Sequence, residues 1–257
     1  MLKSLIAGAC SLGLAALALS GLSGQPTAQA AQDYARSETE APILIELFTS
    51  QGCSSCPPAD RLAHRLDRES GLIILSRPVD YWDRLGWKDT LASPDNTALQ
   101  RAYARRGLGG YNGVYTPQTV VAGAFGEVGS DERALRWQID AARRLAGSAQ
   151  LHVEPVEGKG FAVGLSGETS RAAELHLLGV SREERVTISH GENRGRTIRY
   201  TNVLIGEETL AIWRGGKEGF AIRGDQLRMA GADRYAVVLR EPDGGRVLAA
   251  RWLREGL

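Results

Sequence analysis

Cysteine is scarce in this chain, and so is methionine. Three cysteines and two methionines occur among the 257 residues, and Cys10 lies inside an apolar N-terminal stretch. Cys53 and Cys56 are the only cysteines beyond that stretch. Structural zinc on this pair is disfavoured, because it needs two further ligands and the four histidines show no paired spacing. A Cu(I) site on two thiolates stays open, although two methionines give it little support.

The chain also lacks a surplus of either charge. Its 31 Lys and Arg residues balance 30 Asp and Glu residues, for a net charge of +1. This balance gives no electrostatic reason to expect binding to nucleic acid. With 43% hydrophobic and 24% charged residues, the composition is that of a soluble globular protein with enough length for two modest domains.

The first 30 residues have the pattern of a signal peptide. Lys3 gives a positive start, residues 5–22 are small and apolar, and residues 28–30 form a small-x-small cleavage site. We expect residues 1–30 to be removed on export and residues 31–41 to be a polar linker. A retained membrane anchor is the alternative, since roughly 18 apolar residues can span a bilayer. Export to the periplasm, or secretion, would place the cysteine pair in an oxidising compartment.

Residues 42–147 alternate between strand and helix patterns. The nearly continuous apolar run 42–48 predicts a strand that is covered on both faces of a parallel sheet. Apolar positions 59, 62, 63 and 66 then repeat at helical spacing, so a helix follows directly. Further strands are predicted at residues 72–75, 119–122 and 125–128, and further helices after Ser93 and after Ser130–Asp131.

The pattern changes beyond Gly147. Short alternating runs bounded by Gly and Asp predict antiparallel strands, and residues 242–245 predict a hairpin turn. We therefore expect residues 148–257 to form a smaller, β-rich domain that resembles a sandwich. Arg194, Arg196 and Arg199 form a basic face, which usually means solvation and sometimes a partner site.

Cys53 and Cys56 form a Cys-x-x-Cys pair between the first predicted strand and the first predicted helix. The helix dipole and free N–H groups at a helix start stabilise a thiolate, which favours reversible dithiol exchange. We expect Cys53 to be the exposed nucleophile and Cys56 to be the buried resolving thiol. A permanent structural bridge would gain little chain entropy over so short a loop, but it would look the same in sequence.

The order of elements, with the dithiol at the first strand-to-helix junction, resembles the thioredoxin fold over about residues 41–145. The resemblance implies that Tyr115, Thr116 and Pro117 face the dithiol, with a cis bond before Pro117 and substrate backbone paired along this segment. It also implies that Glu46 lies beneath the dithiol as a proton acceptor. The alternative for this acid in an apolar run is an ion pair with Lys or Arg.

A closer resemblance is to a family of secreted thioredoxin-like proteins known as domain of unknown function 1223. The motifs that carry it are residues 46–58, 80–89 and 115–118. The family brings no activity with it. Trp82 and Trp87 of the second motif could line a lip that grips substrate, although such tryptophans are more often part of the core.

The sequence thus predicts an α/β thioredoxin-like domain over residues 42–147, followed by a smaller, mostly-β domain. The expected function is that of an exported thiol–disulfide oxidoreductase, with no cofactor, metal or stable membrane anchor. It would act on protein thiols or disulfides and on an unidentified redox partner. Its expected catalytic residues are Cys53, Cys56, Glu46 and Pro117. The alternative is a non-catalytic binding module on the same scaffold, with a structural disulfide or a Cu(I) site.

Overall fold

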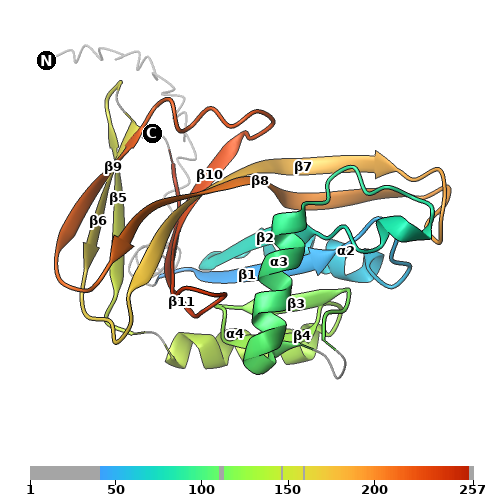
Figure 1. Ribbon diagram of the computed structural model, residues 1–257, viewed down its shortest axis with the longest axis horizontal. Helices are drawn as coiled ribbons and strands as arrows, with labels where there is room; N and C mark the ends of the chain where they lie inside the picture. The colour runs from blue at the N-terminus through green and yellow to red at the C-terminus, as the bar shows by residue number, and fades with distance from the viewer. Residues whose placement is uncertain (1–40, 110–112, 146, 159, 255–257) are drawn as a thin grey trace, which may run out of the picture.

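The computed structural model describes residues 41–109, 113–145, 147–158 and 160–254. The signal peptide predicted for residues 1–30 and nearly all of the predicted linker lie outside this part of the chain. The described residues form two sheets and three short α-helices (Figure 1). None of these helices is long and apolar enough to cross a membrane.

An eight-stranded mixed sheet forms the body of the molecule, in the order β11-β10-β7-β8-β2-β1-β3-β4. Its strands are β1 (Ile43–Thr49), β2 (Leu72–Pro78), β3 (Gln118–Val121), β4 (Phe125–Val128), β7 (Ala173–Thr187), β8 (Thr197–Trp213), β10 (Arg234–Arg240) and β11 (Val247–Trp252). The second sheet, in the order β5-β6-β9, contains β5 (Gln150–Val156), β6 (Gly160–Ser166) and β9 (Glu218–Arg223). The helices are α2 (Pro57–Leu66), α3 (Pro94–Tyr103) and α4 (Glu132–Arg144), with short turns η1 (Asp83–Leu85) and η2 (Ala104–Leu108).

The N-terminal half places α2 directly after β1. All seven residues of β1 are buried, because β2 pairs with one edge, β3 pairs with the other, and α2 and α4 pack on one face. Pro57 and Pro58 occupy the first turn of α2, where a missing N–H costs little. The side chains of Ser93 and Asp131 accept backbone N–H groups at the starts of α3 and α4.

The prediction of an α/β thioredoxin-like domain followed by a smaller, mostly-β domain is wrong. The described chain is mostly β, and its large sheet contains strands from both halves of the sequence. β8 joins β2 in parallel through Ser76 and Val203, and the Ser76 hydroxyl donates to the Thr201 carbonyl at 2.8 Å. The prediction failed because β2 has a second edge that must be covered. β2 is fully buried, so the backbone N–H and C=O groups on its edge away from β1 need hydrogen-bond partners, and β8 lies along that edge.

The large sheet curls until its two ends approach each other. Val247, at the start of β11, donates its N–H to the carbonyl of Ala122, just after β3, at 2.9 Å. One face of β7, β10 and β11 packs on the three-stranded sheet, and the other face packs on side chains of β1 and β2 such as Leu44. Leu177 and Leu178 belong to these two different cores, as alternation along a strand requires.

The hairpin of β7 and β8 reaches across the molecule to α2. These are the longest strands, with 15 and 17 residues, and their far ends lie on the side of α2 (Figure 1). Thr201 Oγ1 lies 3.2 Å from His64 Nδ1, and Asn202 donates to the Asp67 carboxylate at 2.6 Å, so β8 is held against α2. We name residues 188–196, which join the two strands, the tip loop. The hairpin brings the tip loop to the start of α2, where the cysteines lie.

Candidate functional site

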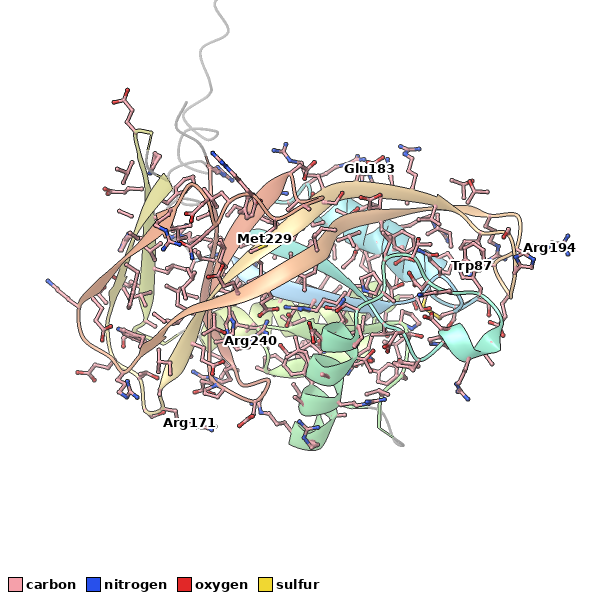
Figure 2. All side chains as sticks on the ribbon, turned by 45° about the horizontal axis from the view of Figure 1, so that its top comes forward. Trp87, Arg171, Glu183, Arg194, Met229 and Arg240 are labelled. Atoms are coloured by element: carbon pink, nitrogen blue, oxygen red, sulfur yellow. A yellow bond between two sulfur atoms is a disulfide. The ribbon has the colours of Figure 1, made fainter. Side chains whose placement is uncertain are left out.

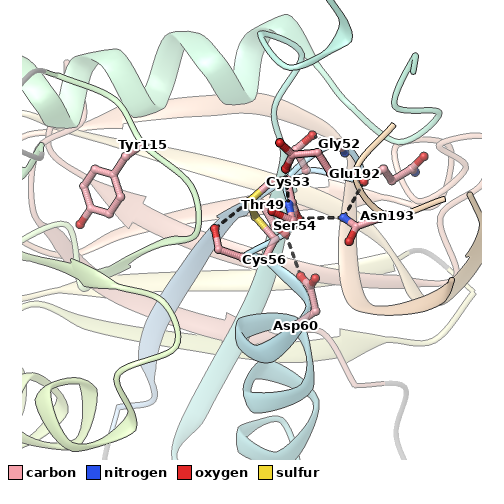
Figure 3. Close-up of a disulfide and its surroundings, with 12 residues drawn as sticks. Thr49, Gly52, Cys53, Ser54, Cys56, Asp60, Tyr115, Glu192 and Asn193 are labelled. Atoms are coloured by element: carbon pink, nitrogen blue, oxygen red, sulfur yellow. Dashed lines mark hydrogen bonds between the residues drawn. A yellow bond between two sulfur atoms is a disulfide. The ribbon is translucent and has the colours of Figure 1, made fainter. Parts of the chain in front are cut away.

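The candidate site is built around a disulfide between Cys53 and Cys56 (Figure 3). The two Cα atoms are 5.4 Å apart, and the Cys56 N–H donates to the Cys53 carbonyl at 3.2 Å. Cys56 is the residue before the first turn of α2, and Pro57 follows it. The pair therefore lies at the positive end of a helix dipole, as the sequence predicted. We name residues 50–56 the cysteine loop.

Both cysteines are fully buried, with 0% relative exposure. The prediction that Cys53 is exposed is therefore wrong. The physical reason is a cover from the second half of the chain, whose approach to the cysteine loop no local sequence pattern shows.

The tip loop forms this cover through hydrogen bonds to the cysteine loop. The Asn193 side-chain amide donates to the carbonyl oxygens of Gln51 at 2.9 Å and of Cys53 at 2.8 Å. The Ser54 N–H donates to the Glu192 carboxylate at 3.1 Å (Figure 3). Asn193 is fully buried, so its two bonds are shielded from water. Sequence reasoning missed both tip-loop residues, and their only signal was a polar, glycine-containing turn between two strand patterns.

Trp87 supports the cysteine loop from another side. Its indole N–H donates to the Gln51 side-chain carbonyl at 2.8 Å, and its ring stacks on His190 of the tip loop at 6.1 Å between centroids. The Asp89 carboxylate accepts the Gln51 backbone N–H at 2.7 Å. Trp87 thus links the cysteine loop to the tip loop. A role for this side chain in substrate binding stays a prediction.

Trp82 packs mostly on the core. Its side chain lies against a buried cluster that contains Phe48 and Tyr103. A Cβ atom placed on Gly52 would lie 3.2 Å from the Trp82 Cβ, so Trp82 also packs directly on the cysteine loop. Its binding role likewise stays a prediction.

Asp60 is a buried carboxyl that sequence reasoning missed. It lies one helical turn after Cys56 on the same face of α2, and its N–H donates to the Cys56 carbonyl at 3.1 Å (Figure 3). The Thr49 hydroxyl donates to Oδ1 at 2.8 Å, while Oδ2 has no hydrogen-bond partner among the described residues. Burial raises the pKa of Asp60 to about 8; the Thr49 bond opposes this rise, and the nearby Asp89 adds to it. The carboxyl is therefore protonated at neutral pH.

Glu46 has the opposite surroundings. Its Oε1 accepts from Arg77 Nε at 2.6 Å and from Arg240 at 2.7 Å, and its Oε2 accepts from the Tyr103 hydroxyl. Burial acts to raise the pKa of Glu46, but Arg240, Arg77 and the Tyr103 bond outweigh it and hold the pKa below its usual range. Glu46 thus makes the ion pairs that the sequence left as an alternative. A role as proton acceptor for the dithiol stays a prediction.

The segment around Pro117 lies next to the first turn of α2. The Thr116–Pro117 peptide bond is cis, as predicted. A Cβ atom placed on Gly129 would lie 3.2 Å from Pro117 Cβ and 3.3 Å from Ala59 Cβ, which puts Pro117 beside this helix. Burial raises the pKa of Tyr115 to about 12, so its hydroxyl is neutral and can donate a hydrogen bond. Contacts of these three residues with substrate stay predictions.

The described residues around the disulfide give no further support to the alternative of a metal site. Within the described parts of the chain, no group of three or more His, Cys, Asp or Glu side chains is arranged to hold a metal ion. A soft metal would therefore depend on the two cysteine sulfurs alone, after reduction of their bond.

Comparisons with known proteins assign the family. Residues 44–240 match the family described as "Protein of unknown function (DUF1223)". A crystal structure of protein AGR_C_4864 from Agrobacterium tumefaciens is similar, with 28% identity and a TM-score of 0.72, over 85% of this chain and 97% of that chain. HBP35 of Porphyromonas gingivalis is similar in fold alone, with 12% identity and a TM-score of 0.53, over 83% of this chain and 75% of that chain. No curated protein gives a significant match. On the match over residues 44–240, this chain belongs to the DUF1223 family.

Proposed function

We propose that this protein is an exported thiol–disulfide oxidoreductase that exchanges the Cys53–Cys56 disulfide with protein substrates. The observation that carries the proposal is the protonated carboxyl of Asp60, buried one turn after Cys56. Burying an ionisable group is costly, and carboxyls with strongly shifted pKa values are frequent at functional sites. A purely structural bridge needs no such acid beside it. The signal-peptide pattern of residues 1–30 supports the exported location.

The exchange can be written with every proton and electron in place. A substrate thiolate attacks Cys53 Sγ, the Cys53–Cys56 bond breaks, and Cys56 leaves with the electron pair and takes the proton of Asp60. A second substrate thiolate attacks the substrate sulfur of the mixed disulfide, and Cys53 leaves as a thiolate at the helix N-terminus. Protons from the two substrate thiols restore Asp60 and protonate Cys53. The substrate loses two electrons, which the protein gains, and the reverse sequence reduces a substrate.

Substrate can reach Cys53 Sγ only when its cover moves. The contacts to be broken are the Asn193 bonds to two carbonyl oxygens, the Glu192 bond to one N–H, and the packing of Ile188 and His190 against Trp87. All of these contacts involve the tip loop, which joins the two strands of the hairpin. Displacement of the tip loop is therefore part of the proposed cycle.

Trapping of mixed disulfides tests the proposal. In Cys56→Ser protein, Cys53 attacks a substrate disulfide but no second thiol releases it, so complexes with exported proteins accumulate. Cys53→Ser protein should trap none. Non-reducing gels and mass spectrometry give the result, and circular dichroism confirms that both variants fold. Equal trapping by both folded variants, or by neither, would show that Cys53 is not the nucleophile.

A structural disulfide in a non-catalytic module is the second candidate. The complete burial of both cysteines and the Asn193 hydrogen bonds favour it. In that case, neither variant traps a partner, and loss of the bridge lowers only the stability of the protein.

A further inference from the structure

A groove with a basic lining begins beside the disulfide. It has a volume of about 940 Å³ and runs between α2 and the start of β8. Ser54 and Pro57 lie at its cysteine end, and Asp60 also contributes to its lining. Its basic side chains are Arg61, His64 and Arg65 from α2, and Arg196 and Arg199 from the tip loop and β8. We name this feature the basic groove.

The positive charge of the basic groove is only partly neutralised. Arg65 pairs with Glu132 at 2.8 Å, and Arg199 lies 3.6 Å from Glu183. Arg61 and Arg196, in contrast, have no carboxylate oxygen within 4.0 Å in the parts of the chain that the structure describes.

Two acids lie close to the cysteine end, and only one of them opposes the positive charge. Asp60 is buried and protonated at neutral pH, because its pKa is about 8. Glu192 is ionised, since its hydrogen bonds with Ser54 hold its pKa below its usual range, and it offsets one of the guanidinium charges. Burial, Arg199 and Arg68 hold the pKa of His64 below its usual range, so His64 is neutral and does not add to the charge. The net charge of the whole chain is only +1, so this concentration of guanidinium groups is local.

We propose that the basic groove binds an acidic segment of the substrate polypeptide, close in sequence to the cysteine that exchanges with Cys53. This inference rests on the proposed function. Guanidinium groups form paired, charge-assisted hydrogen bonds with carboxylates, which suits Asp and Glu side chains. The groove opens beside Ser54 and Pro57, so a chain bound there has its neighbouring cysteine near the disulfide. Its volume has room for several residues of an extended peptide.

Three matched peptide disulfides test the inference on the full chain. Each contains one cysteine disulfide, flanked by acidic residues, by their amides, or by lysines. The protein is first reduced with dithiothreitol, which is then removed, so that the Cys53–Cys56 dithiol supplies the two electrons that reduce one peptide disulfide. The second-order rate constant of this single turnover should be about tenfold higher for the acidic peptide than for the amide peptide, and it should be lowest for the lysine peptide. The preference should weaken between about 0.05 and 0.5 M salt, because salt screens exposed charges.

Charge reversal at Arg61 gives the sharper test. Arg61 is exposed just after the first turn of α2, and glutamate is a good helix former, so Arg61→Glu should fold. It should reduce the acidic-to-amide ratio to about one or below. We compare the ratio of the acidic to the amide rate because Arg61 also lowers the pKa of Asp60. A change in that pKa would alter the rates of all three peptides together and would leave their ratio unchanged. The matched control is Arg171→Glu, an exposed arginine at the opposite end of the molecule from Arg194 of the tip loop (Figure 2), and it should keep the preference.

The outcomes separate the two proposals. Turnover of all three peptides at equal rates would overturn the acidic-segment inference and leave the oxidoreductase intact. Turnover of none would overturn the oxidoreductase. In that case, the basic groove can be tested without disulfide exchange. An acidic peptide with serine in place of cysteine is used, and its binding to the full chain is measured by fluorescence anisotropy. Binding that Arg61→Glu abolishes and Arg171→Glu preserves supports the groove, whereas no binding, or equal binding by both variants, overturns it.

Discussion

Asp60 and Glu46 are both buried carboxyls, yet their neighbours give them opposite charge states. Glu46 contacts Arg77 and Arg240 and is ionised. Asp60 has only the Thr49 hydroxyl as a side-chain hydrogen-bond partner among the described residues, and it keeps its proton at neutral pH. When the surroundings of two acids move their pKa values apart, one acid can serve as a fixed charge and the other as a proton donor or acceptor. Glu46 supplies a fixed charge, and Asp60 can exchange a proton near neutral pH.

The raised pKa of Asp60 predicts that the oxidised protein loses stability as pH rises. The folded state holds the proton up to about pH 8, whereas an unfolded Asp releases it near its usual pKa of about 4. The folded state therefore binds more protons between these values. This single group then contributes a loss of about 1.4 kcal/mol in the free energy of unfolding for each pH unit of rise.

Urea unfolding of the oxidised protein from pH 5 to 8 measures the slope of the whole protein, to which other groups such as Asp89 and His64 also contribute. Asp60→Asn should remove the share of about 1.4 kcal/mol per pH unit that Asp60 contributes, because the amide has no proton to lose. Asp140→Asn, an exposed change on α4, should keep it. An unchanged slope in Asp60→Asn protein would show that the Asp60 carboxyl is ionised in the folded state.

Single residues were only partly predictable from the sequence. Cys53 and Cys56 stand out because a Cys-x-x-Cys pair before a helix has a recognisable spacing. Glu46 stands out as an acid in an apolar run, but its partner Arg240 lies 194 positions away. Asp60 looks like an ordinary acid in the first turn of a helix, where the dipole favours it. Only the packing of α2 on β1 and β8 shows that it is buried.

Among the elements, the tip loop is the part of the β7–β8 hairpin that is bonded to the cysteine loop, and in the proposed cycle it limits access to the disulfide. Asn193 is its main attachment to the cysteine loop, through Gln51 and Cys53. Asn193→Ala should therefore raise the rate at which a small thiol reduces the disulfide, by several-fold. Stopped-flow reduction by dithiothreitol provides the measurement.

Arg194→Ala is the matched control for this change. Arg194 is an exposed tip-loop residue, and its side chain makes no hydrogen bond within the described residues. The Arg194→Ala change should leave the rate of disulfide reduction by dithiothreitol unaltered. An equal rate in Asn193→Ala protein would mean that the tip loop does not limit access to Cys53.

Local patterns predicted the elements before Gly147 well. Strands β1 to β4 and helices α2, α3 and α4 lie where hydrophobic spacing and capping residues placed them. The turn predicted at residues 242–245 is also present, with positive φ at Asp243 and Gly244. The length of β7 was not predictable. Alternating runs near residues 175 and 186 suggest two short strands, but the backbone pairs continuously with β8, with bulges that absorb changes of register.

At the scale of the whole molecule, the two halves of the sequence share one sheet and one charged core. Arg240 of β10 and Arg77 of β2 both bind Glu46 of β1, and Glu207 of β8 binds Arg77 at 2.9 Å. Burial opposes ionisation of Glu207, but Arg77 and Arg240 hold its pKa at about 2. The composition could not show that the two halves share a sheet, because the edge of β2 to which β8 is added exists only once the sheet has formed. The disulfide is likewise enclosed by segments from both halves of the sequence, since the tip loop and Trp87 both contact the cysteine loop.

An equilibrium redox titration of Cys53 and Cys56 in the full chain measures how strongly this enclosure favours the disulfide. The folded protein and the disulfide stabilise each other, so a bridge that serves stability alone has a very negative potential. For an exchanging dithiol, we predict a midpoint above about −300 mV, within reach of thiol partners. A midpoint below about −300 mV would contradict this prediction and identify the bridge as structural.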